Sequence, residues 1–130
     1  MPYSHPRQVI LDETPTMLQM QLYVVFTTPI PENDHLIDEV TPAHLDHQVR
    51  IEKAGHLLAA GPFWTEDEQH HTGDGMFILR AASIAEARAL CDIDPMHTSG
   101  ARRYTIRPWM MNEGGMTLRL SFSDQRFSIS

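Results

Sequence analysis

The chain lacks the features that mark several large classes of protein. Its 130 residues contain one cysteine, Cys91, which excludes an internal disulfide and a metal site built from several thiolates. No run of lysines or arginines is present and the formal net charge is -7, which argues against a nucleic-acid surface. No apolar run is long enough to cross a bilayer, and residues 1–5 do not resemble a secretory signal. These absences predict a cytoplasmic protein that binds neither nucleic acid nor membrane.

The length and composition predict one main domain with an addition at each end. Hydrophobic residues make up 42% of the chain, which is enough to build a core. We expect an N-terminal arm at 1–17, a domain at 18–111 and a C-terminal β-hairpin at 112–130. The arm is polar and interrupted by proline, which predicts extended or loosely docked chain. The hairpin is predicted because apolar and polar residues alternate over 116–122 and again over 127–129.

Within the domain, hydrophobic periodicity and end signals predict four strands and two helices. Thr41 as N-cap and Pro42 at the first helical position mark the start of the first helix, and Gly55 marks its end. Ser83 and Glu86 form a capping box for the second helix. The expected order is a strand at 18–28, a helix at 41–54, strands at 56–60 and 75–81, a helix from 83 that ends before 94, and a strand at 102–110. This order predicts an α+β fold, with an antiparallel sheet and both helices on one face.

The other face of such a sheet needs a cover. Two copies of the chain that pair face to face would supply it, so we expect a homodimer. The first helix is also apolar on two sides, with Leu45 and Val49 on one and Ile51 and Ala54 on the other. A helix of this kind often contacts a partner as well as its own sheet.

Several short motifs resemble the YCII-related (YciI-like) family over residues 19–110. They are His44-Leu45, the run Gly55–Pro62, Asp94-Pro95 after the helix from Ser83, and the closing Arg107-Pro108-Trp109. The resemblance implies a ferredoxin-like fold assembled as a dimeric α+β barrel, with His44 and Asp94 as a catalytic histidine–aspartate pair. It also implies a metal-free lyase reaction such as dehydrochlorination of a chlorinated hydroxyquinol-type ring. Family members usually carry an arginine three positions before the histidine, where this chain has Thr41, so the resemblance does not extend to the substrate.

The residue types support proton transfer independently of the resemblance. An imidazole changes charge near neutral pH, and a carboxylate that bonds it can fix its tautomer. At the expected start of a helix, the positive end of the dipole would keep His44 neutral, as a general base must be. Two simpler interpretations stay open. His44 could be an exposed residue that caps or packs, and Asp94 could only form a turn with Pro95.

Four further residues are candidate substrate contacts. Gly61 would let a ligand approach the backbone, and Pro62 ends the strand beside it. Phe63, next to Trp64, would line the mouth of a pocket or contact a second subunit. His47 lies one helical turn after His44, where the two imidazoles could also bind a metal. No third ligand is evident and no nucleotide-binding glycine motif is present, so we predict no metal and no cofactor.

These residues predict a small enzyme that eliminates from or isomerises a small aromatic or carbonyl compound. His44 would act as the general acid or base, and Asp94 would set its tautomer. One alternative is a non-catalytic dimeric module that binds a ligand or docks onto another protein. A third possibility is a cofactor-independent monooxygenase for quinol-like substrates. The enzyme hypotheses require His44 and Asp94 to lie within hydrogen-bond distance beside a cavity.

Overall fold

The computed structural model describes residues 2–130 and divides the chain into two compact units. One unit comprises residues 21–110, and the other combines residues up to 20 with residues from 111 onward. Each unit is described by itself below. None of the helices in the described part of the chain combines the length and apolar character needed to cross a membrane.

The first unit is built on a four-stranded sheet. Its strands are β1 (Met20–Pro29), β2 (Leu57–Pro62), β3 (Gly75–Leu79) and β4 (Arg102–Met111), in the spatial order β2-β3-β1-β4. β3 runs antiparallel to both neighbours, and Phe77 is opposite Val25 on one side and Ala60 on the other. With a helix between β1 and β2 and another between β3 and β4, this is the predicted ferredoxin-like βαββαβ arrangement.

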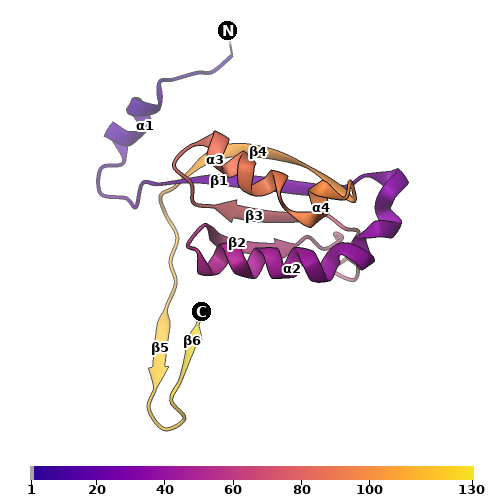
Figure 1. The fold of residues 1–130 in the computed structure, drawn as a ribbon. Coiled ribbons are helices and arrows are strands. Elements are labelled where there is room, and N and C mark those ends of the chain that lie inside the picture. Colours follow the sequence, from indigo (N-terminus) through magenta and orange to yellow (C-terminus); the bar gives the residue numbers. More distant parts are fainter. Residues whose placement is uncertain (1) are drawn as a thin grey trace. The chain divides into compact units, whose positions relative to one another are not determined.

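The helices of this unit lie on the same face of the sheet (Figure 1). They are α2 (Ile37–Lys53), which follows the 3-10 helix η1 (Pro31–Leu36), then α3 (Ile84–Asp92) and the short α4 (Pro95–Thr98). Ser83 caps α3 as predicted, because its Oγ accepts the Glu86 N–H at 3.1 Å and Glu86 returns a bond to the Ala82 N–H at 2.9 Å. Gly55 follows α2 with a φ of +86°, which explains why glycine occupies that position.

The core lies between the helices and one face of the sheet. Alternate residues of each strand point into it, and residues at helical spacing on α2 and α3 pack against them. Each fully buried aliphatic or aromatic side chain contributes about 1.5–3 kcal/mol relative to an exposed one. The buried cluster consists of Tyr23, Val25, Ile51, Leu57, Phe77, Leu79, Ala87, Cys91 and Ile106. Cys91 is therefore a buried small hydrophobic residue, as its position on the helix predicted, and burial raises the pKa of its thiol to about 12.

The predicted start of the first helix is wrong. α2 begins at Ile37 because η1 leads directly into it, and Pro42 lies inside the helix. Proline has no N–H for the carbonyl four residues earlier, but this removes only one helical bond. Thr41 is not an N-cap, and its hydroxyl donates to the Ile37 carbonyl at 2.7 Å. His44 consequently lies past the first turn, where the helix dipole has little effect, so the predicted electrostatic role of the helix end is also wrong.

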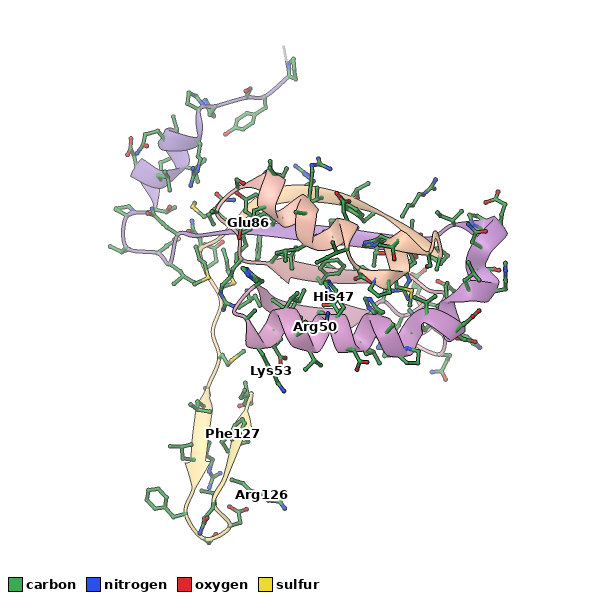
Figure 2. The ribbon with its side chains drawn as sticks, in the orientation of Figure 1. His47, Arg50, Lys53, Glu86, Arg126 and Phe127 are labelled. Carbon is green, nitrogen blue, oxygen red and sulfur yellow. The ribbon has the colours of Figure 1, made fainter. Side chains whose placement is uncertain are left out.

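The terminal unit contains a short helix and a hairpin. α1 (Arg7–Glu13) occupies part of the arm, so the prediction of extended chain is wrong there. Local contacts support this helix, since Gln8 Nε2 donates to Asp12 at 2.8 Å. The predicted C-terminal hairpin is present as β5 (Leu118–Ser121) and β6 (Arg126–Ile129), and Figure 2 shows Phe127 on β6.

Candidate active site

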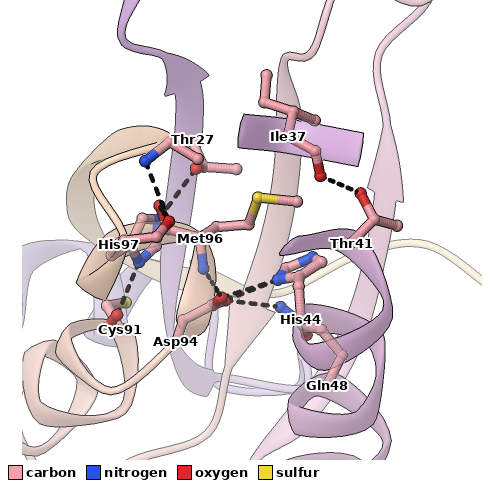
Figure 3. A network of polar contacts seen from close by, with 11 residues as sticks. Thr27, Ile37, Thr41, His44, Gln48, Cys91, Asp94, Met96 and His97 are labelled. Carbon is pink, nitrogen blue, oxygen red and sulfur yellow. Dashed lines mark hydrogen bonds and ion pairs between the residues drawn. The ribbon is translucent and has the colours of Figure 1, made fainter. Parts of the chain in front are cut away.

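The structure brings His44 and Asp94 together across fifty positions of sequence (Figure 3). His44 projects from α2, and Asp94 lies between α3 and α4. The Nδ1 atom of His44 is 2.8 Å from one carboxylate oxygen of Asp94 and 3.0 Å from the other. The side chain of Asp94 is only 1% exposed and that of His44 is 14% exposed. The contact is therefore shielded from bulk water on the carboxylate side and open on the imidazole side.

Asp94 is held in place by more than the histidine. As the N-cap of α4, its Oδ1 accepts the Met96 N–H at 2.9 Å, and Gln48 Nε2 lies 3.4 Å from Oδ2. Burial alone raises the pKa of this carboxyl group. The hydrogen bond and positive charge of His44, with the Met96 amide, outweigh burial and hold the pKa of Asp94 below its ordinary value. Asp94 is therefore ionised at neutral pH. It is a helix cap and a partner of His44 at the same time.

This arrangement fixes which nitrogen of His44 carries the proton. A carboxylate only accepts hydrogen bonds, so Nδ1 must donate, and in the neutral ring Nε2 then holds the free lone pair. His44 also lines a cavity of about 530 Å³. In this tautomer Nε2 is the atom that can accept a proton, and the buried carboxylate behind the ring would stabilise the cation that forms.

The cavity lies beneath α2, at the edge of the sheet where β2 ends and β3 and β4 begin. Of the four predicted substrate contacts, Gly61 and Pro62 line it, and so does the neighbouring Trp64. Its volume is in the range typical of sites for small molecules, about 300–1,000 Å³. The lining residues are Thr27, Ile37, Asp38, Thr41, His44, Leu45, Gln48, Ala60, Gly61, Pro62, Trp64, His71, Asp74, Gly75, Met76, Phe77, Met96 and Arg102.

The other two predicted contacts lie elsewhere. His47 is 4% exposed on the side of α2 that faces the sheet, whereas Lys53 points away from it (Figure 2). Burial lowers the pKa of His47. Phe63 stacks on Phe26, with ring centroids 6.4 Å apart, and does not line the cavity although its neighbours Pro62 and Trp64 do. Neither residue is one of those that line the cavity beside His44.

A second histidine extends the polar network and was not predicted. His97, on α4, donates from Nδ1 to the Cys91 carbonyl at 2.7 Å, and its Nε2 lies 3.0 Å from Thr27 Oγ1 (Figure 3). Burial lowers the pKa of His97, and this neutral ring accepts the threonine hydroxyl. Thr27 lines the cavity, so the network joins α4 to its wall.

Sequence reasoning also missed Arg102, Gln48 and Asp74, all of which line the cavity. A signal for Arg102 was available in the predicted strand. Alternate residues share a face, so Arg102 belongs with Tyr104 and Ile106 on the helix side, where a charged residue is unusual. No comparable local signal exists for Gln48 or Asp74, because their positions depend on the tertiary fold.

The opposite face of the sheet has a second, shallower hollow of about 360 Å³. It is predominantly apolar and lies over β1, β3 and β4. The lining residues are Val24, Phe26, Met76, Ile78, Arg107, Pro108 and Trp109. Within residues 2–130, no group of three or more His, Cys, Asp or Glu side chains is placed to bind a metal ion.

Comparisons with known proteins agree with this fold. The structure is similar to 5-chloro-2-hydroxyhydroquinone dehydrochlorinase (TftG) of Burkholderia phenoliruptrix, solved in complex with 2,5-dihydroxybenzoquinone. The TM-score is 0.57 at 18% sequence identity, and the match covers 68% of this chain and 92% of that one. No similar sequence was found among proteins of curated function. The model of the YCII-related domain matches residues 21–110, which is most of the chain and the whole of the four-stranded unit. The chain therefore belongs to the YCII-related family.

Proposed function

We propose that this protein is a small-molecule enzyme in which His44 and Asp94 transfer a proton. The reaction would be an elimination or an isomerisation of a small aromatic or carbonyl compound. The observation that carries this proposal is the 2.8 Å contact between His44 Nδ1 and the buried Asp94, with the imidazole at a cavity of about 530 Å³. A histidine that only capped or packed would not need a desolvated carboxylate behind it.

In the proposed elimination, Nε2 of His44 takes a proton from a hydroxyl or carbon atom of the substrate. The electron pair of the broken O–H or C–H bond moves into the substrate and forms a new double bond. The leaving group departs with the electrons of its own bond, and the imidazolium later returns the proton to solvent. Asp94 stabilises the imidazolium and keeps the ring oriented. Positioned acid–base groups of this kind contribute roughly 10²–10⁴-fold in rate.

The structural neighbour supports this choice of reaction class. TftG is a dehydrochlorinase that was solved with a small quinone, and its fold matches 68% of this chain. Loss of hydrogen chloride from a hydroxylated ring is an elimination that needs one proton acceptor and one leaving group. His44 and Asp94 supply the acceptor. Thr41, whose hydroxyl is used within α2, supplies no cation for a charged substrate.

The test is turnover by the wild type and by His44→Ala over a panel of chlorinated phenols, quinols and lactones. We expect the variant to lose at least about 10²-fold in kcat on any substrate that the wild type converts. His35→Ala is the matched control, because His35 is an exposed histidine on η1 outside the lining of the cavity. Equal kcat values for His44→Ala and wild type would refute the proposal and favour a binding module.

We also propose that the protein is a homodimer that pairs through the open face of its sheet. Phe26 and Trp109 are 42% and 43% exposed there and line the apolar hollow opposite the helices. Aromatic residues are enriched at protein interfaces because they bury a large apolar area. Phe63, stacked on Phe26, would then contact the second subunit instead of the substrate.

A further inference from the structure

The cavity contains one strong hydrogen-bond donor that the proton transfer does not use. Arg102 is the first residue of β4, it lines the cavity beside His44, and it is 8% exposed. Its Nε atom is buried and has no hydrogen-bond partner among residues 2–130. Within the same residues, no carboxylate forms an ion pair with its guanidinium group.

Such a group is costly to leave without a partner. A buried polar atom that makes no hydrogen bond carries a penalty of about 1–3 kcal/mol, and more when it is charged. Burial lowers the pKa of Arg102, and the negative charges of Asp94 and Asp74 oppose this effect from a distance. An arginine side chain nevertheless stays protonated in proteins. The cavity therefore holds a permanent positive charge that lacks a bonded counter-ion.

The position of Arg102 is fixed by the turn that connects α4 to β4. Gly100, with a φ of +79°, donates its N–H to the His97 carbonyl at 3.2 Å, and the Ala101 N–H bonds Ser99 Oγ at 3.2 Å. The Ala101 carbonyl accepts the Ile30 N–H at 3.0 Å, which ties the start of β4 to the end of β1. Since Asp94 caps the same short α4, one segment of nine residues, 94–102, carries both the partner of His44 and the arginine.

We propose that Arg102 binds an oxyanion of the substrate, so that the substrate of this site is a small aromatic or enolic monoanion. This inference deepens the proposed function and rests on it. The substrate oxygen, as phenolate, enolate or carboxylate, accepts from the guanidinium group while His44 faces the reacting proton. Charge-assisted bonds of this kind are about twice as strong as neutral ones.

The other charges of the cavity set the limit of one negative charge. Asp38 and Asp74 also line it, and Asp74 accepts the Thr28 hydroxyl at 2.6 Å. These two carboxylates would repel a dianion, and Arg102 is the one lysine or arginine among the lining residues that offsets them. A monoanion is therefore the charge state that the cavity accommodates best.

Binding can be measured without turnover by comparing benzoate with benzamide, a neutral molecule of nearly the same shape. Trp64 lines the cavity, so its fluorescence reports on occupancy, and titration calorimetry gives the affinity. We expect the wild type to bind benzoate about tenfold or more tightly than benzamide. Arg102→Gln should abolish this preference and leave benzamide binding unchanged. Arg103→Gln is the matched control, because Arg103 is the next residue of β4 and is exposed.

Arg102→Lys keeps the positive charge and guards against a folding defect in Arg102→Gln, with thermal melting as the check. It should retain part of the preference for benzoate. Benzoate binding no tighter than benzamide in the wild type, including no binding of either, would overturn the inference, as would an unchanged preference in Arg102→Gln. His44→Ala should keep the preference while losing turnover. Loss of the proposed catalysis and loss of anion recognition are thus separate results.

Discussion

The two faces of the sheet differ in what covers them. On the helix side, Tyr23, Val25, Phe77 and Leu79 are buried beneath α2 and α3. On the other side, the neighbouring residues of the same strands line an open hollow, and Phe26 is 42% exposed. A desolvated contact such as His44–Asp94 can persist only on the covered side, because water would screen it on the other. The proposed chemistry therefore belongs to the covered face, and the proposed assembly belongs to the open one.

The largest expected effect is on the covered side, at Asp94. Asparagine is a good N-cap, so Asp94→Asn should leave α4 folded and remove only the negative charge behind His44. We expect kcat to fall by roughly 10²–10⁴-fold with little change in melting temperature. Steady-state kinetics and thermal melting measure the two roles separately. Asp94→Ala, which also loses the cap, should in addition cost about 1 kcal/mol of stability. Full activity in Asp94→Asn would show that the carboxylate has only a structural role.

Truncating neighbouring side chains of β3 that lie on opposite faces of the sheet should change the free energy of unfolding by different amounts. Leu79 is fully buried on the helix side of β3, whereas its neighbour Ile78 lies on the open side. We expect Leu79→Ala to lower the free energy of unfolding by about 2–5 kcal/mol. Ile78→Ala should cost less than half as much in dilute protein, where the open face is uncovered. Urea unfolding at several protein concentrations measures both. Equal costs at every concentration would contradict the comparison.

The assembly proposal predicts a smaller effect, confined to the open face. Phe26→Glu places a charge in the apolar hollow and should weaken dimerisation by about tenfold or more. Leu45→Glu makes the same kind of change on the exposed surface of α2, where Leu45 is 55% exposed, and serves as the control. Sedimentation equilibrium gives the dissociation constants. A monomeric wild type, or equal effects of the two variants, would refute the proposal that the protein dimerises through the open face of its sheet.

The smallest effect concerns pH. Burial lowers the pKa of His97 and of His47 below 6.5, so the unfolded chain binds more protons than the folded one once pH drops below about that value. The free energy of unfolding is therefore not reduced by these two histidines above pH 6.5. It declines as the pH falls below 6.5 toward their pKa values in the folded protein. Melting temperatures at pH 7.5 and pH 5 should show this decline. His97→Gln should reduce it, while the exposed His35→Gln should not. A decline unchanged by His97→Gln would show that this ring does not contribute.

Local signals in the sequence predicted the fold well. Ser83 and Glu86 cap α3, Gly55 ends α2, and the strand patterns give the sheet because each of these features acts through near neighbours. Pro42 misled the prediction, since a proline inside a helix and a proline at its start are similar in sequence. The short helix at Arg7–Glu13 lacks buried residues, so its sequence has no hydrophobic periodicity that would predict it.

The candidate site could be predicted only in part. The resemblance singled out His44 and Asp94, and strand spacing could have singled out Arg102. Gln48 and Asp74 reach the cavity through packing of separate elements, which no local pattern encodes. His97 lies three residues after Asp94, but its neutral state depends on the Cys91 carbonyl and the Thr27 hydroxyl, which only the fold brings near it.

The hairpin β5–β6 has a consequence for where the chain opens locally. Leu118 is opposite Ile129 and Leu120 is opposite Phe127, yet all four side chains are more than half exposed. Two strands without a third neighbour or a packed layer are marginally stable in water. The amide protons of this hairpin should therefore exchange fast. Those of β1 and β3 should exchange only when the whole four-stranded unit unfolds.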